Sequence, residues 1–137
     1  MELQEDLIVD IKVSQVGFFG TSGKMLLPSQ AVVATLIAKI PERQIITTDL
    51  LRKKLAEQFE VQGTCPVTMK KALRAIAHDA TQNVPYWRVI KQNGELMAYY
   101  PGGTQEQAAL LSKEGFEIDM ERKTPRVKNF KSNLIRF

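Results

Sequence analysis

The aromatic side chains that could stack on a flat ligand are concentrated in one short segment. All three tyrosines and the only tryptophan of this 137-residue chain lie within VPYWRVIKQNGELMAYYPGG, residues 84–103. An aromatic ring stacks on an unpaired nucleobase with a gain of about 1–3 kcal/mol, whatever the base. One interpretation of the segment is a stacking pocket for an extrahelical base, faced by Tyr86, and the alternative is that Trp87 and one of Tyr99 or Tyr100 fill the core. Strand alternation would turn Trp87 away from that pocket, into the core, and leaves the direction of Tyr99 open.

A cysteine and a histidine are the other reactive side chains, and the chain has one of each. Cys65 begins the predicted helix 65–79, where the helix N-terminus lowers the pKa of a thiol and favours the thiolate. His78 lies near the far end of that helix, so it cannot act as a base for Cys65. We therefore expect Cys65 to be a capping or packing residue, with a nucleophilic role as the alternative. A structural zinc site needs about four ligands, so no metal or other cofactor is expected.

The basic side chains form two blocks that would suit a polyanionic partner. Residues 43–91 carry nine basic and four acidic side chains, and residues 119–137 carry six basic and two acidic ones. The first ten residues carry four acids, and the net charge of the chain is +4. Because the total is modest, it is the layout of the charges that favours nucleic acid. A solvated charged face is the alternative explanation.

Three segments have the apolar period and the terminal residues of helices. They are residues 29–39 with Ser29 as N-cap, residues 47–59 with Thr47 as N-cap, and residues 65–79 with Pro66 in the first turn. Ser and Thr satisfy the free N–H groups of a first turn, and Pro lacks the N–H that would be unsatisfied there. These local signals predict three helices separated by short connections.

The second and third helices have the pattern of a helix-turn-helix, whose third helix would be the recognition helix. Ala72, Ala75 and Ile76 would form a thin inner face of the third helix. Lys70, Lys71 and Arg74 would project from its other sides toward phosphates. An ordinary helical bundle with a charged surface is the alternative.

Short strands and a hairpin are predicted on both sides of these helices. Asn93-Gly94 between apolar runs is typical of a type I′ turn, in which both residues have positive φ. A hairpin directly after a helix-turn-helix would be a wing. Further strands are expected in residues 7–13 and at the FEI and RVKNF sequences near the C-terminus.

A fourth helix is predicted after the aromatic segment. Thr104 and Gln107 have the spacing of a capping box at its start. Gly115 would end the helix in a left-handed conformation, with Phe116 packing back on it.

The stretch PYWRVIKQNGELMAYYPGGTQEQAALLSKEG resembles a segment of the O6-alkylguanine-DNA alkyltransferases. In that family the segment runs Pro-Cys-His-Arg-Val, a hairpin, Tyr-x-Gly-Gly, and a helix with Leu-Leu and Glu-Gly. Upstream, PSQAVVATLIAKIP, IITTDLLRKKLA and CPVTMKKALRAI are similar to the family's opening helix, its next helix and its recognition helix. The resemblance covers residues 28–116, and it implies a winged helix-turn-helix with double-stranded DNA as partner.

Two departures from the family pattern bear on the activity. The family's enzymes accept the alkyl group on the cysteine of Pro-Cys-His-Arg, helped by the histidine, and this chain has Tyr86 and Trp87 at those positions. A phenol with an ordinary pKa of ~10 and no neighbouring base is a poor nucleophile at neutral pH. The alkyltransferase-like proteins are the closer match, because they carry a tryptophan in place of the cysteine and bind alkylated guanine without repairing it.

The resemblance also assigns roles to individual positions. The residues implied for the base pocket are Tyr86, Trp87, Arg88, Tyr100, Gly102 and Gly103. Glu114 would hold the motif in place. Lys70 stands where the family has the arginine that replaces a flipped base, and since lysine cannot stack like a guanidinium, flipping should be weaker. Thr48 stands where the family has a tyrosine that presses on the phosphate, and the expected DNA contacts are Thr47, Thr48, Lys70, Lys71 and Arg74.

We therefore expect an α+β, mainly helical protein, a winged helix-turn-helix with a short β-hairpin wing. Its parts would be an N-terminal strand and Gly-rich connector (1–27), an alkyltransferase-like domain (28–116) and a basic tail (117–137). The expected function is non-enzymatic DNA binding, with recognition of alkylated guanine by base flipping and signalling to a repair protein. The alternatives are a protein- or small-molecule-binding module on this scaffold, and a methyltransferase that uses Cys65.

No apolar run of the sequence approaches the ~18 residues that a membrane span needs. The N-terminus is acidic, where a signal peptide would be basic. With one cysteine and no disulfide framework, the sequence predicts a cytoplasmic protein.

Overall fold

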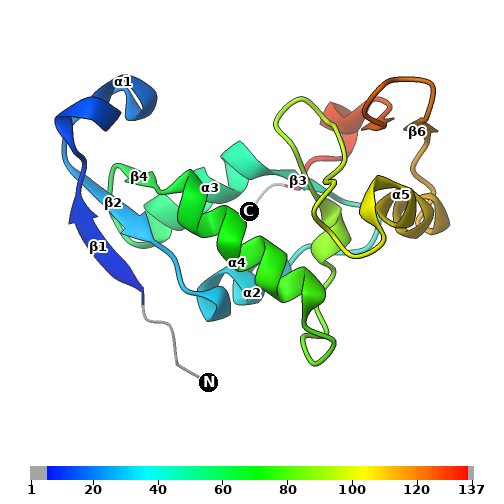
Figure 1. Cartoon of the computed structure of the whole chain (residues 1–137), viewed down its shortest axis with the longest axis horizontal. Helices are drawn as coiled ribbons and strands as arrows, with labels where there is room; N and C mark the ends of the chain where they lie inside the picture. The colour runs from blue at the N-terminus through cyan, green and yellow to red at the C-terminus, as the bar shows by residue number, and fades with distance from the viewer. Residues whose placement is uncertain (1–5, 136–137) are drawn as a thin grey trace.

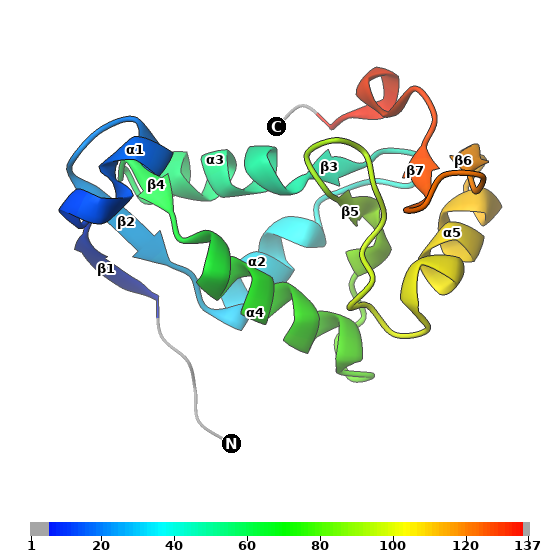
Figure 2. The ribbon, with the colours of Figure 1, turned by 45° about the horizontal axis from the view of Figure 1, so that its top comes forward.

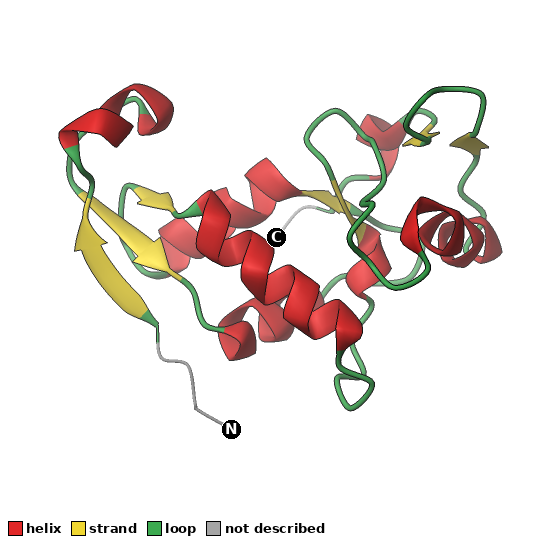
Figure 3. Cartoon of the chain, viewed as in Figure 1, coloured by secondary structure: helices red, strands yellow, loops and turns green. Residues whose placement is uncertain are grey.

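The chain folds into a central group of three helices, with a small sheet at one end and a further helix with short strands at the other. The computed structural model describes residues 6–135 (Figure 1). Figure 3 distinguishes the yellow sheet, the red helices and the green loops that connect them. Within the described residues, no helix is long and apolar enough to span a membrane. The same residues contain no group of three or more His, Cys, Asp or Glu side chains that could hold a metal ion.

The N-terminal sheet joins the start of the chain to the connection between two core helices. Its strands are β1 (Leu7–Asp10), β2 (Lys24–Leu27) and β4 (Gly63–Thr64), and between β1 and β2 lie the short helices η1 (Val13–Gln15) and α1 (Val16–Phe19). β2 pairs antiparallel with β1 and parallel with β4. Phe19 packs so closely on Gly63 that a Cβ there would lie 2.3 Å from the ring. The strand predicted over residues 7–13 is confirmed for its first four residues.

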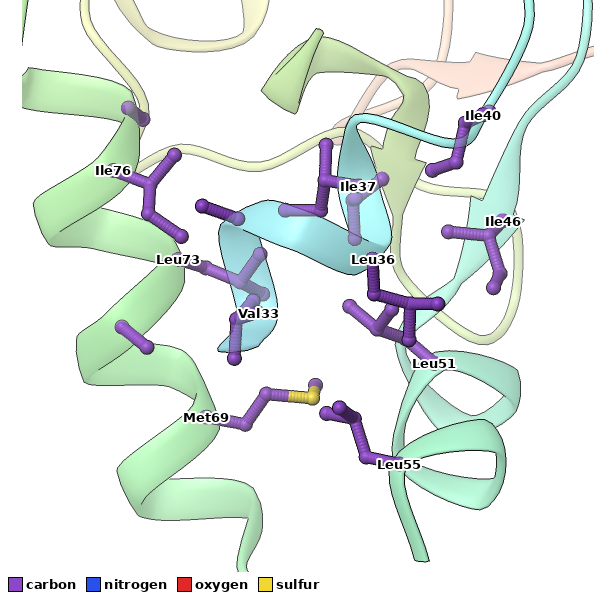
Figure 4. Close-up of a cluster of buried hydrophobic side chains, with 14 of the residues drawn as sticks. Val33, Leu36, Ile37, Ile40, Ile46, Leu51, Leu55, Met69, Leu73 and Ile76 are labelled. Atoms are coloured by element: carbon purple, nitrogen blue, oxygen red, sulfur yellow. The ribbon is translucent and has the colours of Figure 1, made fainter. Parts of the chain in front are cut away.

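Three helices enclose the main hydrophobic core, and they confirm the three helices predicted upstream of the aromatic segment. They are α2 (Gln30–Ile37), α3 (Thr48–Gln58) and α4 (Pro66–His78). Figure 4 shows α2 between the other two, with Leu73 of α4 and Leu51 of α3 directed toward it. The Ser29 hydroxyl caps α2 by accepting a hydrogen bond from the Val32 N–H at 3.1 Å.

Two details of these helices differ from the sequence prediction. Ala75 is exposed, and the buried face of α4 consists of Met69, Ala72, Leu73, Ile76 and Ala77. Ala75 follows Lys71 by four residues, which places both on the solvent side of the helix. Thr47 is the N-cap of α3 by position, but its side chain makes no capping hydrogen bond and is buried.

The aromatic segment forms a tight turn and not a two-stranded hairpin. Its elements are η2 (Tyr86–Arg88) and β5 (Val89–Ile90), and β5 pairs in parallel with β3 (Ile46–Thr47). The Lys91 N–H donates to the Glu95 carbonyl and the Gly94 N–H to the Lys91 carbonyl, each at 2.9 Å. Within this loop only Gly94 has a positive φ, of 89°. The loop therefore has three residues with a type I turn, and the predicted type I′ turn is wrong. The residues after it pair with the C-terminal tail, through Glu95 and Arg126.

The fourth helix, α5 (Gly103–Lys113), begins earlier than the sequence predicts. Its N-cap position is Gly102, which has a φ of 76°, and Thr104 lies inside the first turn. The predicted capping box is therefore wrong, because Gln107 does not bond the helix start and is buried elsewhere. The predicted C-terminus is confirmed. Gly115 has a φ of 100° and Phe116 is buried.

The tail packs onto the end of the molecule that carries α5 (Figure 2). Its elements are β6 (Ile118–Asp119), β7 (Arg126–Val127) and η3 (Phe130–Asn133), and β6 pairs antiparallel with β7. The Ile45 N–H donates to the Asn133 carbonyl at 3.0 Å, and the Ile45 carbonyl accepts the Ile135 N–H at 2.9 Å. A second core joins the tail to α5 and β5, and it consists of Ile45, Ile90, Leu96, Ala108, Leu111, Phe116 and Val127. Short strands are present at both predicted places, but β6 shares only Ile118 with the predicted FEI strand, and β7 covers only the first two residues of the predicted RVKNF strand.

Candidate nucleic-acid interface

A hollow of about 210 Å³ opens between α3, α4 and the 91–94 turn. We call it the Tyr99 hollow; its lining residues are Thr48, Arg52, Pro66, Met69, Lys70, Leu73, Lys91, Met97 and Tyr99. Met69, Leu73 and Met97 are buried and form its apolar floor. Arg52, Lys70 and Lys91 bring positive charge from α3, α4 and the turn. An apolar floor with surrounding cations suits a flat uncharged ring attached to a phosphate backbone.

Tyr99 is the aromatic residue of the segment that lines this hollow. The Lys70 ammonium lies 5.3 Å from the centre of the Tyr99 ring, which is a cation–π distance. The Tyr99 carbonyl is 2.9 Å from His78 Nε2, so the end of α4 is tied to the segment. Burial raises the pKa of Tyr99 to about 12, so its phenol is neutral at physiological pH. The sequence left the direction of Tyr99 open, and the structure directs it toward α4.

Tyr100 is a core residue and not the wall of a base pocket, which corrects the sequence prediction. It is 2% exposed, and its hydroxyl donates to the Val89 carbonyl at 3.3 Å. Burial raises the pKa of Tyr100 well above its ordinary value. Its ring contacts those of Tyr86 and Tyr99 edge-on, with centroids 5.1 and 5.2 Å away. Tyr100 therefore supports the two other tyrosines from the interior.

Tyr86, which the sequence resemblance placed at the family's cysteine position, is half-buried and lies outside the Tyr99 hollow. Burial raises the pKa of Tyr86, and the negative charge of Glu106 raises it further. A raised pKa means less phenolate at neutral pH and a weaker nucleophile. The Tyr86 ring contacts those of Trp87 and Tyr100, and within residues 6–135 its hydroxyl makes no hydrogen bond to a base.

One buried carboxylate holds Trp87 and Arg88 in place. Glu114 accepts the Trp87 indole N–H at 2.7 Å and the Arg88 Nε–H at 3.0 Å. It also accepts the backbone N–H of Arg43 at 2.9 Å, while Arg88 donates to the Ile40 carbonyl at 2.7 Å. We call Glu114, Trp87, Arg88 and the Arg43 amide the Glu114 cluster. The positioning role expected for Glu114 agrees with these contacts, whereas Trp87 and Arg88 lie outside the Tyr99 hollow.

Gln107 fastens the aromatic segment from another side. Its amide donates to the carbonyls of Trp87 and Val89 at 3.0 and 3.1 Å, and its carbonyl accepts the Met97 N–H at 2.6 Å. The sequence prediction used this side chain for a capping box and missed this role. A signal was present, because Gln107 precedes the apolar Leu111 by one helical turn and so shares its buried face.

The basic residues of α4 lie on two sides of the helix. Lys70 lines the Tyr99 hollow, whereas Lys71 and Arg74 line a second hollow of about 380 Å³ with Ala75 and His78. All three cations are exposed. The small side chain of Ala75 leaves room beside them for another backbone to approach.

Of four further predicted site residues, one lines the Tyr99 hollow and three do not. Thr48 lines the Tyr99 hollow. Thr47 is 2% exposed, so its hydroxyl cannot contact a phosphate, which corrects the prediction. Gly102 and Gly103 have φ values of 76° and 69° and form the turn into α5, outside the hollow.

Seven of the nine residues that line the hollow are absent from the predicted site, among them Arg52, Lys91 and Met97. Arg52 could have been found, because it follows Thr48 by four residues on the same helix. Lys91 and Met97 could not, since only the tertiary fold brings the turn and the residues after it to α4.

Cys65 agrees with the capping or packing role that the sequence favours. It is half-buried at the N-cap of α4, and its Sγ accepts the Thr68 hydroxyl at 3.4 Å. α4 has 13 residues, and at about 1.5 Å per residue its far end with His78 lies roughly 20 Å away. His78 therefore cannot act as a base for this thiol, whose hydrogen-bond partner among the described residues is Thr68.

The likeness to known proteins concerns both the sequence and the fold. Residues 28–116 match the family model of the 6-O-methylguanine DNA methyltransferase DNA-binding domain. No curated protein sequence matches the chain. The fold is similar to S. pombe Atl1 in complex with damaged DNA containing O6-carboxymethylguanine, at 22% identity, and to S. pombe ATL in complex with DNA, at 21% identity. Each likeness has a TM-score of 0.60 and covers 79% of this chain and 94% of the other, and it shows a common mixed helix-and-strand fold.

Proposed function

This chain belongs to the family of the 6-O-methylguanine DNA methyltransferase DNA-binding domain, and from that premise we propose that it binds double-stranded DNA and recognises alkylated guanine without removing the alkyl group. In this proposal α3 and α4 are a helix-turn-helix, α4 is its recognition helix, and the 91–94 turn takes the place of the wing. The observation that carries the proposal is the Tyr99 hollow, where an aromatic ring and an apolar floor lie among three cations.

The exposed face of α4 provides the phosphate contacts. Lys70, Lys71 and Arg74 are exposed over little more than one helical turn, so their long side chains can reach phosphates of both strands across a groove. Ala75, which the sequence prediction placed in the core, lies among them. A small residue there allows the helix axis to approach the DNA, because no side chain holds it off.

The Tyr99 hollow provides a place for an extrahelical base. The base would stack on Tyr99, and the thioethers of Met69 and Met97 would accommodate an added alkyl group, because methionine adapts its shape to irregular apolar partners. Arg52 and Lys91 would hold the flanking phosphates. Lys70 would enter the space that the base leaves, and since an ammonium does not stack, we expect extrusion to be less favourable than with arginine.

Among residues 6–135, neither Tyr86 nor His78 is suited to accept the alkyl group at this place. Tyr86 has a raised pKa and, among the described residues, no hydrogen bond from its hydroxyl to a base, and the imidazole of His78 lies against the Tyr99 carbonyl. A bound lesion would therefore persist, and its removal would fall to a repair protein, which we propose as the second partner. The S. pombe Atl1 structure with damaged DNA supports a DNA partner for this fold.

The decisive experiment compares two duplexes that differ by one methyl group. The full chain is titrated with fluorescent duplexes containing either O6-methylguanine or guanine, at about 100 mM salt, where exposed charge pairs are already screened. We expect tighter binding of the lesion duplex, loss of binding to both duplexes in Lys70→Glu, and no change in Lys12→Glu, a matched lysine in the N-terminal region. Equal affinity for the two duplexes would contradict recognition of the lesion. An unchanged affinity of Lys70→Glu would show that α4 does not contact the DNA.

Two further measurements address the alternatives. If neither duplex binds, the Tyr99 hollow serves another ligand and the protein is a protein- or small-molecule-binding module. Intact mass after incubation with the methylated duplex tests the methyltransferase that would use Cys65. We expect an unchanged mass, because the hydrogen-bond partner of the Cys65 thiol is the Thr68 hydroxyl and not a base that could form the thiolate.

A further inference from the structure

A second groove, of about 470 Å³, lies between the C-terminal end of α5 and the tail. The residues that matter for its chemistry are Arg43, Lys113, Glu117, Lys128, Asn129 and Asn133. It has no residue in common with the Tyr99 hollow. In Figure 2 the tail elements and α5 occupy one end of the molecule, with η3 far from α4. Part of the wall comes from residues 128–133, outside the range that matches the family.

The groove has an excess of available positive charge. Arg43, Lys113 and Lys128 are exposed, and within residues 6–135 none of their side chains pairs with a carboxylate. Glu114 also lines the groove, but its two oxygens already accept the four N–H contacts of the Glu114 cluster. Glu117 is left as the one lining carboxylate without a side-chain partner among the described residues. A ligand for this groove therefore needs negative groups and some hydrogen-bond donors.

The backbone fixes the two walls before any ligand binds. Arg43 and Asn129 are two of the three non-glycine residues with positive φ among the described residues, at 71° and 52°. The Arg43 N–H is held by Glu114 at 2.9 Å, and the Lys128 N–H by the Glu117 carbonyl at 2.9 Å. Such conformations are costly for a residue with a Cβ and collect at functional sites. A wall that is already ordered reduces the entropy lost on binding.

We propose that this groove binds an acidic peptide segment of a partner protein. Carboxylates of the peptide pair with Arg43, Lys113 and Lys128, while its backbone N–H groups donate to Glu117 and to the side-chain oxygens of Asn129 and Asn133. A DNA backbone offers only acceptors and negative charge, so it would leave Glu117 facing phosphates. The mixed lining therefore favours a peptide over a second DNA segment. The inference does not depend on DNA binding at the Tyr99 hollow.

The test uses the full chain and a labelled probe peptide. A fluorescein-labelled dodecapeptide of alternating Glu and Ser is titrated at low salt and followed by fluorescence anisotropy, with the same peptide carrying Gln in place of Glu as control. The double variant Arg43→Gly and Lys128→Gln should weaken binding of the Glu peptide about fivefold to tenfold, in line with two partly exposed ion pairs. Glycine suits the positive φ of position 43 and keeps the N–H that Glu114 accepts. Lys12→Gln, a control that removes one positive charge outside the groove, should bind like the original chain.

Each other outcome overturns the proposal. Equal binding of the Glu and Gln peptides would show that charge is not what is recognised. An unchanged affinity of the double variant, with unfolding as in the original chain, would place the peptide elsewhere, and Lys113→Gln repeats this test on the α5 wall without touching the left-handed residue. If the double variant also lost affinity for duplex DNA by the same factor, Arg43 and Lys128 would be DNA contacts and not peptide contacts.

Discussion

The two sides of the aromatic segment differ in their polar groups, which are buried and paired on one side and exposed on the other. On the side of the Glu114 cluster, the Arg88–Glu114 ion pair is buried, with side-chain exposures of 13% and 7%, and the Trp87 indole is hydrogen-bonded to it. On the side of the Tyr99 hollow, Lys70 and Lys91 are exposed and face an apolar floor.

This difference separates stability from binding within one short segment. Polar groups that are buried and fully hydrogen-bonded stabilise the fold. Removing one of them leaves its buried partner with no hydrogen bond to protein or to water. Groups that stay exposed around a hollow contribute little to folding and keep their interactions for a ligand. Substitutions on the two sides should therefore affect different measurements.

The largest effect is expected from Glu114→Ala. The substitution leaves the buried Arg88 guanidinium unpaired, and it removes the acceptor of the Trp87 indole and of the Arg43 amide. Breaking a buried, hydrogen-bonded ion pair on one side costs about 3–5 kcal/mol. Urea unfolding should show this loss in the free energy of unfolding, whereas the exposed neighbour Glu117→Ala should stay within about 0.5 kcal/mol. Equal, small losses in both variants would show that the Glu114 cluster does not stabilise the fold.

The next largest effect is expected from Gln107→Leu. The Met97 N–H and the Trp87 carbonyl would lose their partner inside the protein, while the Val89 carbonyl would keep the Tyr100 hydroxyl. Leaving buried backbone groups unsatisfied costs about 1–3 kcal/mol each, so we expect the free energy of unfolding to fall by about 2–4 kcal/mol. Gln105→Leu, on the exposed side of the same helix, is the control for side-chain chemistry. A variant at position 107 as stable as this control would contradict the role assigned to Gln107.

On the other side of the segment, Tyr99→Ala should weaken DNA binding and also lower the free energy of unfolding, because the half-buried ring packs against the main core. Loss of one stacking ring corresponds to about 1–3 kcal/mol, which is about fivefold to 150-fold in the dissociation constant of the lesion duplex. Tyr99→Phe keeps the ring and should bind within about twofold of the original chain. If Tyr99→Phe binds as weakly as Tyr99→Ala, the hydroxyl and not the ring is recognised, and the stacking interpretation is wrong.

The same segment should make the fold sensitive to alkaline pH. Burial raises the pKa of Tyr99 to about 12 and that of Tyr100 well above its ordinary value, so the folded state holds these protons more tightly than the unfolded state. The contribution of these groups is fully present below pH ~10 and is lost as the pH rises through the folded-state values. We expect the free energy of unfolding to fall between pH ~10 and ~12. At pH ~11 the loss that Tyr99 causes should be about 1 kcal/mol or less, after allowance for solvent screening. Tyr99→Phe should make this fall shallower, and an identical pH profile would contradict burial of the Tyr99 phenol as its cause.

The parts of the fold that the sequence predicts are those that local chemistry determines. The Ser29 hydroxyl bonds the first turn of α2, Pro66 fits the first turn of α4, and Gly115 takes the left-handed conformation that ends α5. Each of these depends on residues within four positions of itself. The family resemblance added the place of Tyr86 at the nucleophile position and the role of Glu114, neither of which a local pattern could have supplied.

The parts that the sequence misses depend on contacts between distant segments. Tyr99 and Tyr100 are adjacent and both aromatic, and only the packing of α4 against the segment decides that the first lines a hollow and the second is buried. The Asn93-Gly94 pair favours a type I′ turn in isolation, but the residues after it pair with Arg126 of the tail and not with β5. Pairing with the distant tail thus overrides the local preference of Asn93-Gly94 for a type I′ turn. In the resulting turn, Lys91 lines the Tyr99 hollow.

The smallest effect, and the finest test of the comparison, is expected from Lys91→Gln. Lys91 is exposed and lines the Tyr99 hollow from the turn, so it should contact one phosphate and contribute little to folding. Removing one phosphate contact should reduce the slope of log affinity against log salt by about 0.9 in magnitude, and it should weaken lesion and normal duplexes by the same small factor. Lys39→Gln, an exposed lysine after α2, should leave the slope unchanged. A Lys91→Gln variant that lost only the preference for the lesion would mean that this lysine reads the base itself, and the division between a phosphate-binding rim and an apolar, base-binding floor would be wrong.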